Sequence, residues 1–87
     1  MYSAVFDEAW QKHFEKLDYG VQDRVSKKIK QILEFPQKRH LKKGASFFVA
    51  EAGQFRILYM VFEENKEVRF FFVGNHKEYE KWYKQFF

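Results

Sequence analysis

The sequence predicts an α+β fold with the element order β-α-α-β-β-β and a short C-terminal helix. Apolar residues recur at helical spacing in the first part of the chain, form strand-like runs after residue 44, and return to helical spacing at the end. We therefore expect an antiparallel sheet packed against a helical hairpin. At 87 residues and 10.7 kDa, the chain has room for one domain, spanning residues 1–87.

One strand and two helices are predicted before the middle of the chain. Residues 2–6 favour a strand, and Asp7 is placed to cap the helix that follows. The segment 18–20 is expected to end this helix. A second helix runs from about residue 21, carries an aliphatic stripe on one side, and ends at Pro36 because proline cannot continue a helix.

Three further strands are predicted at residues 47–52, 55–62 and 68–73, after a basic connector at 37–44 that is expected to be a loop. Their short connections favour an antiparallel meander, with the N-terminal strand at an edge. The strand at 55–62 is apolar on both faces. We expect the two helices to cover one face, and the C-terminal segment, a partner chain or both to cover the other.

Composition and charge restrict the classes of function. Sixteen Lys and Arg against twelve Asp and Glu give a net charge of +4, which favours a polyanionic partner. The absence of cysteine excludes disulfides, thiolate nucleophiles and cysteine-based zinc sites. His13 and His40 have no ligand partners at metal spacing, so no metal site is predicted. No apolar run is long enough to span a bilayer, and we expect a cytoplasmic protein with no membrane contact.

Two segments in the last third of the chain carry residues suited to chemistry. The first, 53–59, contains Arg56, and the second, 73–79, contains His76 and Tyr79. An arginine fork matches two phosphate oxygens, and histidine moves protons near neutral pH, so together they favour chemistry on nucleic acid.

Each of these residues also has a purely structural interpretation. Arg56 is an ordinary strand arginine if it pairs with Glu51 or Glu78, and His76 is a turn residue or a helix cap. Aromatic residues at helical spacing near the C-terminus indicate burial before they indicate a nucleotide platform.

The order of elements and these two motifs resemble the RelE/ParE superfamily of toxin–antitoxin toxins along the whole chain. The resemblance implies a RelE-like toxin that inhibits translation by metal-independent, ribosome-dependent cleavage of mRNA. Its implied partners are a cognate antitoxin that wraps it, the ribosome and mRNA, with no cofactor. Members of the ParE branch inhibit DNA gyrase instead.

The resemblance also implies roles for individual residues. Arg56 matches the strand arginine that holds the scissile phosphate, and His76 matches the basic or histidine position after the last strand. Either Tyr79 or Tyr83 matches the C-terminal aromatic residue that stacks on or activates the nucleotide. The predicted catalytic residues are Arg56, His76 and Tyr79. The predicted RNA-binding residues are Lys42, Lys43, Lys77 and Tyr83.

The chain departs from the family pattern on the strand before the arginine. Family nucleases often carry lysine or arginine there, whereas this chain has Val49 and Glu51. RNA cleavage then needs one of the predicted RNA-binding lysines to supply the missing charge, or Glu51 to act as a base. Three interpretations follow: a metal-independent endoribonuclease, which is the leading one; a non-enzymatic inhibitor of gyrase or the ribosome; and a decayed module that only binds its antitoxin.

Overall fold

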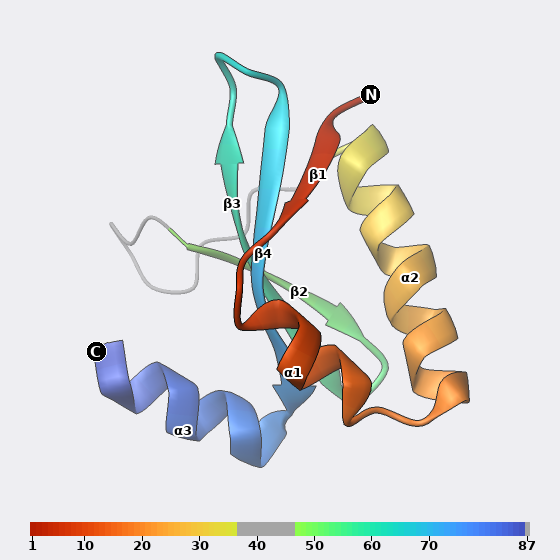
Figure 1. Ribbon diagram of the computed structural model, residues 1–87, viewed down its shortest axis with the longest axis vertical. Helices are drawn as coiled ribbons and strands as arrows, with labels where there is room; N and C mark the ends of the chain where they lie inside the picture. The colour runs from red at the N-terminus through yellow and green to blue at the C-terminus, as the bar shows by residue number, and fades with distance from the viewer. Residues whose placement is uncertain (37–46, 87) are drawn as a thin grey trace.

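The computed structural model describes residues 1–36 and 47–86, which form a mixed α+β structure (Figure 1). The strands are β1 (Ser3–Phe6), β2 (Phe48–Ala52), β3 (Phe55–Phe62) and β4 (Glu67–Asn75), and the helices are α1 (Trp10–Glu15), α2 (Tyr19–Glu34) and α3 (His76–Phe86). The predicted fold class and the order of its elements are confirmed.

The described strands form one sheet in the order β1-β4-β3-β2. The pairs β2–β3 and β3–β4 are antiparallel, as the short turns predicted, and β1 lies at an edge. However, β1 pairs with β4 in parallel, so the sheet is mixed and not wholly antiparallel. Tight turns impose antiparallel pairing only on the strands they join, and β1 reaches the rest of the sheet through two helices.

The helices begin at different residues from those predicted. Asp7 forms a turn ahead of α1, in which its carbonyl oxygen accepts a hydrogen bond from the Trp10 N–H at 3.0 Å. Asp18 was expected to help break the chain, but its side chain accepts a hydrogen bond from the Val21 N–H at 2.9 Å and caps α2. An aspartate in this position starts a helix, so Gly20 is helical.

A bulge in β4 changes the face to which its later side chains point. Leu58 pairs with Phe72 and Tyr59 pairs with Phe70, which leaves Phe71 as an extra residue in β4. Strict alternation puts Phe70 and Phe72 on one face. The extra residue turns Phe72 to the opposite face, where it packs with Leu58.

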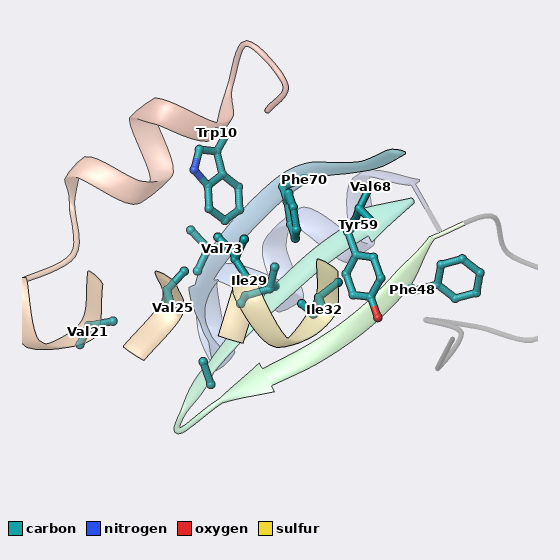
Figure 2. Packing of buried hydrophobic residues seen from close by; sticks show 12 residues of the cluster. Trp10, Val21, Val25, Ile29, Ile32, Phe48, Tyr59, Val68, Phe70 and Val73 are labelled. Atoms are coloured by element: carbon teal, nitrogen blue, oxygen red, sulfur yellow. The ribbon is translucent and has the colours of Figure 1, made fainter. Parts of the chain in front are cut away.

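The larger core lies between the sheet and the helices α1 and α2 (Figure 2). The predicted aliphatic stripe of α2 is buried there, with Val25 fully inaccessible and Ile32 only 3% exposed. Ile57, Tyr59 and Phe70 face these helices from the sheet. The alternation of β3 therefore predicted correctly which side chains face the helical hairpin.

The opposite face of the sheet, here called the second face, is covered by α3. Val49, Leu58 and Phe72 are buried there, with Tyr79 and Trp82 of the helix packed against them. The Trp82 ring stacks on Phe72 with 5.6 Å between ring centroids. Of the covers expected for this face, the structure shows the C-terminal segment, so the apolar character of β3 is not independent evidence for a partner.

Candidate functional site

The candidate site lies at the end of the sheet where the β2–β3 turn, the C-terminal end of β4 and the start of α3 come together (Figure 1). Arg56 follows the first residue of β3, and its register partners are Glu51 of β2 and Gly74 of β4. His76 begins α3 directly after β4. Strand pairing thus brings the arginine and the histidine to the same end of the sheet.

Two hydrogen bonds fix the direction in which α3 leaves β4. The Asn75 side chain accepts from the Glu78 N–H at 2.9 Å, and the Glu78 carboxylate accepts from the Asn75 N–H at 3.0 Å. This reciprocal pair is a capping box. Gly74 permits the sharp turn, since a β-carbon there would lie 2.7 Å from Phe72 Cζ. The first turn of α3 is therefore held close to β4.

The half-buried side chain of Arg56 stacks on α3. Its guanidinium carbon lies 4.8 Å from the centroid of the Tyr79 ring, within the range of a cation–π contact. The Tyr79 and Tyr83 rings lie 6.0 Å apart with an interplanar angle of 36°. Stacking engages the flat face of a guanidinium, whereas its N–H donors point outward in the plane. Arg56 is thus oriented by the helix while its donor edge can serve a ligand.

The His76 side chain contacts Glu80 along α3. Its Nε2 lies 3.0 Å from Oε1 of Glu80, one helical turn further on. The side chains are 61% and 53% exposed, so solvent weakens this attraction. The contact turns the imidazole along the helix, and an anionic ligand with better geometry can replace the carboxylate.

Two open depressions adjoin at this end of the sheet, and Arg56 and His76 line both. The first, the polar depression, is lined by Glu51, Gly53, Gln54, Arg56, Asn75, His76 and Lys77. The second, the aromatic depression, is lined by Arg56, His76, Tyr79, Glu80, Tyr83 and Lys84. A chain laid across both would meet polar groups on one side of the arginine and aromatic rings on the other.

Most of the residues predicted for the site therefore meet at these depressions. Those brought together are Arg56, His76, Lys77, Tyr79 and Tyr83. Lys42 and Lys43 lie outside the residues that the structure describes. Sequence reasoning did not assign Asn75 or Glu80, although the Asn-x-x-Glu spacing of a capping box and the four-residue spacing from His76 to Glu80 were both present.

The two positions where the family often carries a basic residue differ from each other. Val49 is 8% exposed and belongs to the core of the second face, opposite Leu58. Glu51 is exposed, lies opposite Arg56 in the sheet and lines the polar depression. Only the second position therefore borders the site, where it adds a carboxylate in place of a cation.

His13 of α1 packs at the edge of this region. Its ring centroid lies 4.7 Å from that of Phe72 in an edge-on contact. Burial lowers the pKa of His13, and the nearby positive charge of Lys16 lowers it further, while Glu78 acts in the opposite direction. The imidazole therefore favours the neutral form and serves as packing between α1 and β4.

Residues 1–36 and 47–86 lack two further classes of feature. No cluster of three or more metal-ligating side chains is found in this part of the chain. None of its helices is both long enough and apolar enough to cross a bilayer.

Comparison with protein-family models gives no match, and comparison with curated protein sequences gives none either. Solved structures do match. A chain of the intact E. coli RelBE toxin–antitoxin complex is 26% identical with a TM-score of 0.76, covering 86% of this chain and 96% of that one. The isolated E. coli RelE toxin is 23% identical with a TM-score of 0.75, and both chains are covered completely. A chain of the RelBE2 complex of Mycobacterium tuberculosis is 22% identical, with a TM-score of 0.76 over 86% of this chain and 98% of that one.

The match extends over the elements that build the site, because the isolated E. coli toxin aligns from end to end. The four-stranded sheet and the helices of the described residues, including the short C-terminal helix, are consistent with this fold. The fold is that of the RelE toxins, and solved structures at 25–26% identity with TM-scores of 0.76 support the RelE-like toxin superfamily for this chain.

Proposed function

We propose that this protein is the toxin of a toxin–antitoxin pair and that it inhibits translation in the cytoplasm by metal-independent, ribosome-dependent cleavage of mRNA. The convergence of Arg56, His76 and Tyr79 on two adjoining open depressions carries the proposal. Solved complexes of similar toxins with their antitoxins support an antitoxin as the cognate partner.

In the proposed reaction the 2′-oxygen of a nucleotide attacks the adjacent phosphorus and the bond to the 5′-oxygen breaks. This requires a base for the 2′-hydroxyl proton, an acid for the leaving oxygen, and positive charge for the phosphorane. Arg56 supplies the charge through two donors, with Tyr79 holding its plane. His76 transfers a proton and exchanges its contact with Glu80 for one with the substrate.

The neighbouring residues suit the nucleotides on either side of the scissile phosphate. Lys77 lines the polar depression, where its charge attracts a phosphate. Tyr79 and Tyr83 line the aromatic depression, where a base can stack on a half-exposed ring. Lys42 and Lys43 are proposed to add further phosphate contacts.

One observation favours a second candidate, a non-enzymatic inhibitor of the ribosome or gyrase. Arg56 and His76 each have a carboxylate close by: Glu51 opposite Arg56 in the sheet, and Glu80 against His76. Negative charge here reduces the attraction for a phosphorane. In this case the same surface binds its target and breaks no bond.

The test is cell-free translation with the purified protein, with mRNA ends mapped by primer extension. Cuts within translated codons are expected, and Arg56→Ala and His76→Ala should reduce them by about 100-fold or more. Arg69→Ala is the matched control. Its guanidinium carbon also lies over an aromatic ring, 5.9 Å from the centroid of Phe62, but it is far from the site in the β3–β4 register.

The outcomes separate the candidates. Cleavage that persists at the original rate in both Arg56→Ala and His76→Ala contradicts the proposed chemistry. Translation arrest with intact mRNA supports the non-enzymatic inhibitor. No effect on translation or on gyrase supports a module that retains only antitoxin binding.

A further inference from the structure

Arg24 of α2 reaches the turn between β2 and β3. A β-carbon added to Gly53 would lie 3.2 Å from Nη1 of Arg24, so the guanidinium rests directly beside this glycine. Gly53 has a φ of +64°, a left-handed conformation that glycine adopts without strain. The turn therefore combines a tight backbone with the close approach of a cation from another element.

Gly53 also lines the polar depression, together with Arg56 and Lys77. The turn thus has positive charge on two sides, from Arg24 on the side of α2 and from Arg56 and Lys77 on the side of the site. Figure 1 shows this turn beside the first turns of α2.

The fold gives Arg24 no other evident task. It is exposed, and residues 1–36 and 47–86 contain no ion pair of this side chain. The acidic residue next to it, Asp23, pairs instead with Lys27 at 3.0 Å. An exposed guanidinium beside the polar depression, which Arg56 and Lys77 also line, is suited to a phosphate, whose oxygens match its fork of donors.

We propose that Arg24 binds a backbone phosphate of the same RNA strand whose scissile phosphate is bound by Arg56. The strand then crosses the β2–β3 turn at Gly53, leaving the polar depression on the side of α2. This inference rests on the proposed function, and it adds a binding residue on an element outside the catalytic cluster. Phosphodiester groups of mRNA and of ribosomal RNA share this chemistry, so the test separates the two sources.

The first arm measures binding of a single-stranded RNA oligonucleotide with 2′-O-methyl groups, which cannot be cleaved, over a range of salt concentrations. Arg24→Gln is expected to weaken binding by about 5- to 10-fold and to reduce the salt slope by about 1, as for the loss of one phosphate contact. Arg24→Lys keeps the charge and should recover most of the affinity.

Lys30→Gln is the matched control for this arm. It removes the same charge from an exposed position on α2, about 240° further round the helix, and so away from the turn. Its affinity should stay within about 2-fold of the unmodified protein. Equal affinities of Arg24→Gln and Lys30→Gln overturn the proposal.

The second arm measures ribosome binding and mRNA cleavage by the same variants. Reduced cleavage by Arg24→Gln together with weaker oligonucleotide binding supports the path across Gly53. Loss of ribosome binding with unchanged oligonucleotide affinity assigns the contact to ribosomal RNA and overturns it. If Arg56→Ala abolishes cleavage while Arg24→Gln behaves as the unmodified protein in both arms, only this inference fails. If the unmodified protein neither binds RNA nor cuts mRNA, the proposed function fails with it.

Discussion

The two faces of the sheet are covered by very different amounts of structure. The first face packs against α1 and the sixteen-residue α2, and its core joins residues from both helices and all four strands. The second face packs mainly against α3, over three buried side chains, with His13 of α1 in contact with one of them, Phe72. His76 and Tyr79, which are proposed as catalytic, and Tyr83, which is proposed to bind RNA, all belong to α3. The first face therefore supplies most of the stability, and the second face carries most of the proposed site. We expect a substitution on one face to have a limited effect on the other.

Matched aromatic truncations test this separation most strongly. Phe70→Ala on the first face should lower the free energy of unfolding by about 3–5 kcal/mol, because Phe70 is fully buried and contacts Phe6, Trp10 and Tyr59. Trp82→Ala on the second face should cost less, about 1–3 kcal/mol, because Trp82 is only partly buried. Urea unfolding followed by circular dichroism measures both.

Amide hydrogen exchange shows which helices and strands lose stability in each variant. In the Trp82→Ala protein, exchange should accelerate in α3 while the amides of α2 stay protected, since α3 loses its stacking on Phe72. Phe70→Ala should accelerate exchange throughout. Uniform acceleration in both variants would mean that the two faces form one cooperative unit and that the separation is wrong.

Sequence periodicity gave the side-chain faces correctly wherever the backbone is regular. Helical spacing identified the buried stripe of α2, and alternation placed Arg56 and Leu58 on the face opposite Ile57. It failed where one residue changes the register. The bulge at Phe71 has no local signal in a run of three phenylalanines, and it decides that Phe72 supports α3.

The residues of the candidate site were proposed from the sequence, but their arrangement could be predicted only in part. Arg56 and His76 were identified from residue chemistry and motif spacing, and strand pairing explains why they meet. Contacts between α3 and the strands depend on how far the chain turns back after Gly74, which is set by the tight space beside Phe72. The stacking of Arg56 on Tyr79 is a tertiary contact that no spacing along the chain specifies.

The burial of Tyr59 in the first face should make the stability of the protein fall at alkaline pH. Burial raises the pKa of Tyr59 from 10.0 to about 12, so the folded protein keeps this proton when the unfolded chain has lost it. The contribution is fully present below pH 10 and is lost as the pH rises toward 12, on the order of 2–3 kcal/mol in total. Urea unfolding at pH 9 and pH 11 measures the decline.

Tyr59→Phe should flatten this decline, because the group that titrates is gone. Tyr19→Phe is the control, since Tyr19 is 89% exposed and should leave the pH dependence as it was. A decline of the same size in Tyr59→Phe would assign the alkaline sensitivity to other groups, and the first face would then be less sealed from solvent than its burial indicates.

The smallest of these effects concerns the attachment of α3 to β4. Asn75→Ala removes the side-chain half of the capping box and should destabilise the first turn of α3 by about 1 kcal/mol, whereas Glu78→Gln should retain most of it because glutamine also fits this position. Lys81→Ala, at an exposed position on the same helix, controls for a general loss of helicity.

Protection of the α3 amides from hydrogen exchange and mRNA cleavage should decline together in Asn75→Ala, because the cap places both His76 and Tyr79 beside Arg56. Faster amide exchange in α3 with unchanged mRNA cleavage would show that the packing of α3 on the second face positions the site without the cap.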